Sequence, residues 1–339
     1  MNSYPHVVLV TGTGTKERFS NYIPEFSKIN GQLTIVTLNE DENLRNMRNY
    51  QKIIKVMLDR KVAAGSVVLG IGDHEIVNLA GFVAATYLGG VDFIPVPTSL
   101  YGQITTLTSG RFYLNFSSRR NAISAWLLPV ESYADLDLIK MNGTEEIAEG
   151  LIEAIRLGTF ADTSTITLLE HIEDSQAIRL PDNSVRIIEK CIRCKLNNSE
   201  RGSARMETGN VLAEMFSDVD RGKHAPSRIR SLGLLLELYF GERYGVRTRE
   251  LRDRLTKLFQ SMEIKPLLLR DLGIDSVMRH FRSNYSGEHP LKILVPGSDG
   301  SLETVTMDEE RFSGVLRSYV ENFEFIPGQA FPEKRYYKQ

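Results

Sequence analysis

The sequence predicts an α/β domain with a parallel sheet, followed by a mainly helical domain. In the first third of the chain, short runs rich in β-branched residues alternate with helical patterns, and this strand–helix–strand order favours a parallel sheet with right-handed crossovers. After about residue 140, apolar residues recur every three to four positions, which is typical of helices. We therefore expect domains over 1–140 and 141–339, with the boundary near 138–143.

The predicted elements follow in order. Four strands end in glycine, proline or polar residues, at 6–12, 32–38, 66–72 and 91–97. Helical patterns lie between them at 42–61 and 75–88. The second domain shows helical spacing at 144–158, 184–197, 204–218, 226–242, 247–261 and 309–324, and only 291–296 is typical of a strand.

Composition excludes several classes of protein. The 41 basic and 43 acidic residues give a formal charge of −2, so no overall basic character indicates nucleic-acid binding. No apolar run approaches the roughly 18 residues of a membrane helix, and the first residues lack a signal-peptide pattern. Two cysteines, Cys191 and Cys194, cannot form a disulfide framework. We expect a cytoplasmic protein that binds neither nucleic acid nor membranes.

Three local motifs have a structural and a functional interpretation. TGTGTK at 11–16 lacks the full spacing of a phosphate loop, so we interpret it as an ordinary strand-to-loop turn. CIRC at 191–194 has metal-site spacing but no second cysteine pair, which favours two half-buried helical side chains. LGIGDHEIVNLAGF at 69–82 is a strand, a glycine turn and a helix opening, where backbone N–H groups can hold a pyrophosphate. Its Asp73 would repel a phosphate.

Residues 66–137 resemble the sugar-phosphate cyclase superfamily, the family of 3-dehydroquinate synthase. The resemblance is carried by NLAGFVAATYLGGVDFIPVPTSLYGQ at 78–103 and NAISAWLLPVESYADLDLI at 121–139. It implies a Rossmann-like nucleotide-binding domain, an all-helical metal-binding domain, an active site between them and a homodimer. Several details resemble the 2-deoxy-scyllo-inosose synthase branch, namely Asn78, Ser99, Ser109, Glu207 and the segment RSNYSG at 282–287.

The resemblance implies NAD and a divalent metal, zinc or cobalt, in a reaction that eliminates phosphate and closes a carbocycle. The family's metal ligands are a glutamate and two histidines. Glu153 matches the first and His224 the third, whereas the second falls on Asn210, a poor zinc ligand. Glu214, one helical turn later, could supply a carboxylate instead. A site of Glu153, Glu214 and His224 and an empty site both remain open.

Other family positions differ in this chain. The active-site aspartate falls on Thr105, and two lysines fall on Arg111 and Arg156, which keep the charge but not the geometry of an ammonium. An arginine that reaches the partner subunit's phosphate site falls on Gly89. The candidate catalytic residues are Arg111, Asn115, Arg156, Lys190 and Glu207.

The cofactor positions give contrasting evidence. Glu42 and Arg45 fit the pair that holds the adenosine ribose, and Asn78, Thr98 and Ser99 also fit the family pattern. Gly72 is present, but Asp73 and His74 replace the two glycines that follow it. We therefore expect weak or absent NAD binding.

Three functions remain open from the sequence. The first is a divergent cyclase-type enzyme, a phosphate-eliminating lyase of secondary metabolism that acts on an anionic sugar phosphate or a cyclitol-like molecule. The second is a non-catalytic homologue that serves as a binding or scaffold subunit. The third is an enzyme of a different reaction class on the same scaffold, since fold does not fix function. The retained positive charges favour an anionic small-molecule ligand.

Overall fold

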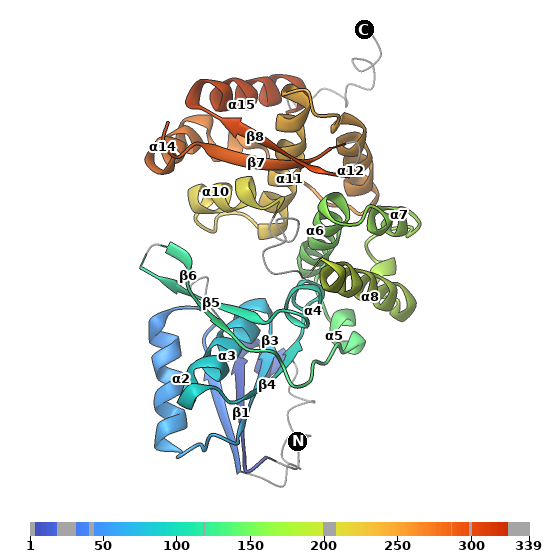
Figure 1. The fold of residues 1–339 in the computed structure, drawn as a ribbon. Coiled ribbons are helices and arrows are strands. Elements are labelled where there is room, and N and C mark those ends of the chain that lie inside the picture. The colour runs from blue at the N-terminus through green and yellow to red at the C-terminus, as the bar shows by residue number, and fades with distance from the viewer. Residues whose placement is uncertain are drawn as a thin grey trace. The chain divides into compact units, whose positions relative to one another are not determined.

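The computed structural model describes residues 4–18, 32–40, 44–117, 119–198, 208–285, 287–297 and 300–324. The chain divides into two compact units. The first contains residues 1–154 and 164–200, and the second contains residues 155–163 and 201–339. The long helix α6 (Thr144–Phe160) contributes to both units. Figure 1 shows the elements of each unit.

The first unit is built on a four-stranded parallel sheet in the order β2-β1-β3-β4 (Figure 1). The β1 and β3 strands are buried along their whole length, as expected for the centre of a parallel sheet covered on both faces. The strands are β1 (His6–Gly12), β2 (Gln32–Leu38), β3 (Val67–Gly72) and β4 (Asp92–Pro97).

Helix α3 (His74–Thr86) is the core helix of this unit. Nine of its 13 residues are buried, and it packs against β3, β4 and the hairpin of β5 (Arg111–Phe116) and β6 (Arg119–Trp126). Gly81 permits the hairpin's close approach, because a β-carbon there would lie 2.5 Å from the Phe112 ring. The remaining helices are α1 (Thr13–Arg18), α2 (Met47–Asp59), η2 (Tyr87–Gly89), α4 (Leu100–Thr106), α5 (Leu136–Lys140), α7 (Ser164–Glu170), η3 (Ala177–Arg179) and α8 (Pro181–Asn197).

The second unit is built around helix α11 (Pro226–Arg243), which is buried over 13 of its 18 residues. Stacked rings of Phe240, Phe281 and Phe312 join α11, α14 and α15 in one apolar core. The other elements are α10 (Val211–Asp220), α12 (Arg249–Ser261), α13 (Leu269–Leu272), α14 (Ile274–Asn284), the antiparallel hairpin of β7 (Leu291–Pro296) and β8 (Leu302–Met307), and α15 (Glu309–Phe323).

The predicted α/β and helical parts are confirmed, with local corrections. All four predicted strands form the parallel sheet. The β5–β6 hairpin and β8 were not predicted, because exposed polar residues interrupt their alternation. The second unit is therefore mainly helical rather than all-helical. Part of the predicted helix at 204–218 lies outside the described residues, and α10 continues to Asp220.

The interpretation of TGTGTK as an ordinary turn was wrong, because the short helix α1 begins at Thr13. Its first N–H groups are satisfied by a carboxylate from elsewhere in the sequence: Glu40 accepts hydrogen bonds from Gly14 N, at 2.6 Å, and from Thr15 Oγ1. The two cysteines of the CIRC motif lie on α8 as expected, but both are fully buried rather than half-buried, and neither is in a disulfide.

The part of the chain that the structure describes contains no helix both long and apolar enough to cross a bilayer.

Candidate functional site

The turn between β3 and α3 is occupied by the protein's own side chains. Asp73 is the N-cap of α3, and its Oδ1 accepts a hydrogen bond from Ile76 N at 2.9 Å. Gly72 is needed for packing, because a β-carbon there would lie 2.7 Å from Cβ of Ile76. The helix N-terminus that could hold a pyrophosphate is therefore already capped by a carboxylate.

His74 and Thr105 fix this turn to helix α4. The His74 Nδ1 lies 3.1 Å from Thr105 Oγ1, and the imidazole packs edge-on against Tyr101 with ring centroids 5.1 Å apart. Lys195 on α8 donates to the Thr105 carbonyl at 3.2 Å. The turn is therefore joined to α4, which is itself bonded to α8, and these contacts oppose a movement that would admit a dinucleotide.

Arg45, the predicted ribose-binding arginine, bonds to other side chains of the first unit. The Arg45 guanidinium is buried, and its Nε lies 2.6 Å from Glu75 while Nη1 donates to Asn121 at 2.8 Å. These bonds connect the loop before α2 with α3 and β6. Glu42, the predicted acidic partner of Arg45, lies outside the described residues.

The three other predicted cofactor residues are buried and hydrogen-bonded within the first unit. Asn78 accepts from Tyr113 N at 2.7 Å, Thr98 N donates to the Gly72 carbonyl, and Ser99 caps α4 through Gly102 N. The structure brings Gly72 and Thr98 together at the ends of β3 and β4. The bonds of Asn78 and Ser99 are equally consistent with a structural role.

The predicted catalytic residues of the first unit lie at the hairpin and on α8. The Arg111 guanidinium lies 4.3 Å from the centroid of the Trp126 ring, in a cation–π contact. Asn115 accepts a hydrogen bond from Asn121 N at 2.9 Å. Lys190 lies on α8, and Glu207 lies outside the described residues.

Asn115 also lines a cavity of about 650 Å³ beside the first turns of α2. Arg48 and Lys52, one helical turn apart, are the cations of its lining. Its other lining residues are the carboxamides Asn39, Asn46 and Asn49 and the neutral side chains Met47, Phe116 and Ser117. Such a lining suits an anionic ligand better than a cationic one.

In the second unit, two buried ionisable side chains hold the start of helix α10. Arg156 donates to the Thr208 carbonyl at 2.7 Å, and Glu237 accepts from Leu212 N at 2.9 Å. The residue at the N-cap position, Asn210, makes no capping hydrogen bond with its own side chain. Complete burial raises the pKa of Glu237 to about 8, against the opposing influence of the helix N–H groups and of Arg156. Glu237 therefore replaces the usual N-cap and is largely protonated at neutral pH.

His224 is held by Asp220 at the other end of α10. The imidazole Nδ1 lies 2.5 Å from Asp220 Oδ1, and the His224 backbone N–H donates to Oδ2 at 2.9 Å. Burial alone would raise the pKa of Asp220, but the hydrogen bonds and charge of His224 and the Lys223 N–H lower it overall. Because an ionised carboxylate can only accept, Nδ1 carries the proton and Nε2 is the remaining ring nitrogen.

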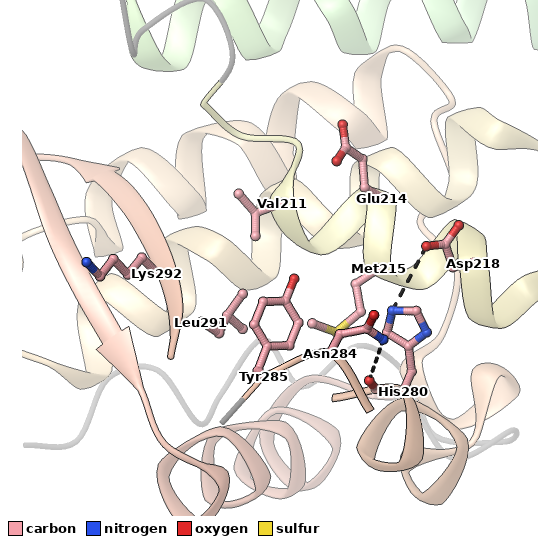
Figure 2. Close-up of a pocket in the computed structure, with 9 residues that line it drawn as sticks. All are labelled: Val211, Glu214, Met215, Asp218, His280, Asn284, Tyr285, Leu291 and Lys292. Carbon is pink, nitrogen blue, oxygen red and sulfur yellow. Dashed lines mark hydrogen bonds and ion pairs between the residues drawn. The ribbon is translucent and has the colours of Figure 1, made fainter. Parts of the chain in front are cut away.

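Glu214, in the first turn of α10, lines a cavity of about 400 Å³ (Figure 2). Asp218 follows one turn later and lies 4.0 Å from His280 Nε2. Tyr285 adds a phenol whose pKa is raised by burial and then by the charges of Glu214 and Asp218. The other lining residues are Val211, Met215, Asn284, Leu291 and Lys292.

His224 has the donor arrangement of a metal ligand, but the described residues assemble no metal site around it. A histidine whose Nδ1 donates to a carboxylate, leaving Nε2 open, has the arrangement found in most ligating histidines. Glu214 lies at the opposite end of α10, about 9 Å of axial rise from Asp220. Glu153 is buried on α6 in the other unit. Across the described residues, no three His, Cys, Asp or Glu side chains gather around one point, so the ligand set stays a prediction.

Comparisons with known proteins match 3-dehydroquinate synthases by sequence and, by fold, cyclases as well as alcohol and glycerol dehydrogenases. A family model for the 3-dehydroquinate synthase N-terminal region matches residues 35–149. A 3-dehydroquinate synthase of Thermoplasma volcanium is 27% identical over 94% of this chain and 89% of its own length. The fold matches 2-deoxy-scyllo-inosose synthase in complex with carbaglucose-6-phosphate, NAD⁺ and Co²⁺, with a TM-score of 0.83, 14% identity and coverage of 93% of this chain and 91% of that one. The comparisons support the sugar-phosphate cyclase superfamily, with the family model matched over residues 35–149 of this chain.

A second solved cyclase supports the same assignment of fold. The 2-epi-5-epi-valiolone synthase ValA of Streptomyces hygroscopicus subsp. jinggangensis 5008, with NAD⁺ and Zn²⁺ bound, has a TM-score of 0.81 and 13% identity. The match covers 94% of this chain and 92% of that chain. These cyclases share the fold of the present protein, and their bound groups are properties of those proteins.

Sequence reasoning missed several residues of the candidate site. Asp220 and Glu237 were not singled out, although Asp220 stands four residues before His224 and Glu237 is a lone acid in the apolar run LGLLLELYF. The acid in that run was a usable signal, because an ionisable residue within an apolar helix is rarely buried without a partner. The members of the Figure 2 cavity are separated by up to 81 residues, between Val211 and Lys292, so no local motif connects them.

Proposed function

We propose that this protein is a divergent enzyme of the sugar-phosphate cyclase superfamily that binds a sugar phosphate or a cyclitol-like small molecule. The observation that carries the proposal is the cavity of Figure 2, whose volume of about 400 Å³ suits a small ligand. Glu214, Asp218 and Tyr285 offer hydrogen-bonding groups for hydroxyls, and Lys292 is the ammonium of the lining. Val211, Met215 and Leu291 supply apolar surface for the C–H face of a ring.

The family's chemistry adds a nicotinamide, which takes up and returns hydride, and a divalent metal, which polarises a substrate hydroxyl. We propose His224 as the residue of the second unit that would hold the metal, and a homodimer as the assembly, which light scattering would test. We propose that NAD, if used, is held weakly, because Asp73 caps α3 and His74 contacts α4. The anion-suited cavity beside α2 is the place in the first unit where a cofactor phosphate could be held.

A non-catalytic homologue is the second candidate. The observation that favours it is the same β3–α3 turn, because a protein that cannot hold NAD cannot begin the family's reaction. A binding subunit could keep the cavity of Figure 2 while the redox step is lost.

The test is calorimetric titration with glucose 6-phosphate, followed by an assay of phosphate release with NAD and Co²⁺. Our proposal expects binding that weakens at least about 10-fold in both Glu214→Gln and Tyr285→Phe, since a lost hydrogen bond to a ligand costs about 1–1.5 kcal/mol. Tyr244→Phe is the matched control, because Tyr244 is outside the cavity.

Phosphate release above the uncatalysed rate supports the enzyme, and binding without release supports the second candidate. Equal binding by the wild-type protein, Glu214→Gln and Tyr285→Phe would show that the ligand is held elsewhere.

A further inference from the structure

The cavity of about 650 Å³ beside helix α2 combines positive charge with an exposed aromatic ring. Arg48 and Lys52 lie four positions apart on one face of α2, and both are exposed. Phe116, at the end of β5, lines the same cavity and keeps 54% of its surface accessible. Because cations bind phosphate and an open aromatic face stacks with a nucleobase, this lining suits a phosphorylated nucleoside.

The two cations of the cavity are not neutralised by acids of its lining. The Arg48 guanidinium forms no hydrogen bond or ion pair with the rest of the described chain. Lys52 donates to the Thr37 carbonyl on β2 at 3.0 Å, which holds its ammonium near the carboxyl end of that strand and leaves further N–H groups for an anion. None of the described lining residues is acidic, so both charges can act on a ligand.

The cavity adjoins the loop that connects α2 with the β3–α3 turn. Arg45 immediately precedes the lining residue Asn46, and its guanidinium bonds Glu75 in the first turn of α3. The Arg45 carbonyl accepts a hydrogen bond from Asn115 N at 2.8 Å, which joins the loop to β5. A phosphate in this cavity would therefore lie beside the predicted ribose position and apart from the N-terminus of α3, which Asp73 caps.

The end of β2 has the residue types that suit a phosphorylated ribose. In α/β folds that bind nicotinamide dinucleotides, an acid near a strand end accepts a hydrogen bond from the ribose 2′-hydroxyl of NAD, whereas an arginine accommodates the 2′-phosphate of NADP. Here the residue after β2 is Asn39, which lines the cavity, and the next acid, Glu40, is bonded to α1 instead. The described residues at this strand end therefore offer a carboxamide and two cations.

We propose that the cavity beside α2 binds a 2′-phosphorylated adenosine, the group that distinguishes NADP from NAD. Arg48 and Lys52 hold the 2′-phosphate, and the adenine lies against Phe116. The inference rests on the proposed function, in which this cavity holds a cofactor phosphate, and it names that phosphate. It requires no pyrophosphate at the β3–α3 turn, where Asp73 and His74 disfavour both dinucleotides.

The experiment is calorimetric titration of the full chain at low salt with 2′-AMP and with 5′-AMP, which differ only in the position of the phosphate. We expect 2′-AMP to bind at least about 10-fold more tightly, and Arg48→Gln and Lys52→Gln each to reduce this preference at least about 5-fold, because each removes a charge-assisted hydrogen bond. Lys55→Gln is the matched control, since Lys55 is an exposed lysine of the same helix outside the cavity lining.

Two further measurements identify the occupant. Phe116→Leu should weaken the binding of both nucleotides alike, and inorganic phosphate should bind more weakly than 2′-AMP because it has no base to stack. Equal binding of 2′-AMP and 5′-AMP would overturn the proposal, as would a preference that survives in both Arg48→Gln and Lys52→Gln. Inorganic phosphate that binds as tightly as 2′-AMP would show that the cavity holds free phosphate and would overturn the nucleotide.

The same variants separate this inference from the proposed function. Glucose 6-phosphate binding without a preference for 2′-AMP would overturn this inference alone. A preference for 2′-AMP without glucose 6-phosphate binding would overturn the role of the cavity of Figure 2 and support the nucleotide site.

Discussion

The carboxyl of Glu237, in the middle of α11, accepts the backbone N–H of Leu212 at the start of α10, 25 positions earlier in the chain. Glu237 is completely buried, and its other oxygen, Oε2, finds no hydrogen-bond partner among the described residues. This bond joins the helix that carries Glu214 and Asp220 to the core helix of the second unit, in addition to the apolar core that the two helices share. The geometry of the candidate site therefore depends on a group whose charge changes with pH.

Stability should fall as pH rises, because the pKa of Glu237 is raised from 4.5 to about 8 by burial. The folded protein holds this proton more tightly than the unfolded chain does. The stabilisation is therefore complete below pH 4.5 and is lost as pH approaches 8, at about 1.4 kcal/mol per pH unit at most.

Urea unfolding of the wild-type protein and Glu237→Gln from pH 5 to 8 measures this dependence. We expect the glutamine variant to be the more stable of the two at pH 8, with a difference that shrinks toward pH 5. Glu237→Leu, which removes the acceptor for Leu212 N, should be less stable than Glu237→Gln throughout. Parallel pH profiles for the wild-type protein and Glu237→Gln would contradict the prediction.

The opposite pH dependence is expected in the first unit at His6. Desolvation, and then the charge of Arg60, lowers the pKa of His6 below 6.5, and its Nε2 lies 2.7 Å from Thr34 Oγ1. Because the fold favours the neutral ring, this stabilisation is present above pH 6.5 and is lost as pH falls through the lowered pKa. In His6→Gln, the melting temperature should fall less steeply than in the wild-type protein as the pH is lowered below 6.5. An equally steep fall in both proteins would show that other groups control stability in acid.

The NAD affinity of the protein should rise when the β3–α3 turn is opened. We expect weak or absent binding by the wild-type protein and an increase of at least about 5-fold in the Asp73→Gly, His74→Gly double variant. The lost negative charge at the helix N-terminus alone accounts for about 0.3–1 kcal/mol. Calorimetry with NAD measures the change, and Asp73→Asn isolates the effect of the charge. Tight NAD binding by the unmodified protein would contradict this prediction and would favour a cyclase-type enzyme over a non-catalytic homologue.

Gly209 should be essential for the entry into α10. Its φ is +86°, and a β-carbon there would lie 2.3 Å from the Phe160 ring and 3.0 Å from Cγ of Arg156. Gly245 has the same φ but no atom within 4 Å of its β-carbon position, which makes Gly245→Ala a matched control for backbone strain. We expect Gly209→Ala to lose about 1–3 kcal/mol more stability than Gly245→Ala in chemical unfolding. Equal losses would mean that Phe160 and Arg156 can move aside at no cost.

The sequence by itself determined the sheet strands and the main helices, and it indicated the superfamily. Apolar runs gave the four strands of the parallel sheet, and apolar spacing gave α6, α8, α11, α12 and α15, because burial of one face leaves a local periodic pattern. The segment at 78–103 was enough to indicate the cyclase fold that the comparisons confirm. The metal ligands, the catalytic residues and the weak binding of NAD stay predictions.

Only the tertiary structure decided which side chains meet. Glu40 caps α1 from 25 positions away, and Glu237 caps α10 from a neighbouring helix. Arg156, predicted to bind an anion, donates to a buried carbonyl instead of standing free. The type of a residue determines which hydrogen bonds and ion pairs its side chain can form. Its actual partner depends on which helices pack together. That packing is set by the summed burial of many apolar groups, which no local motif contains.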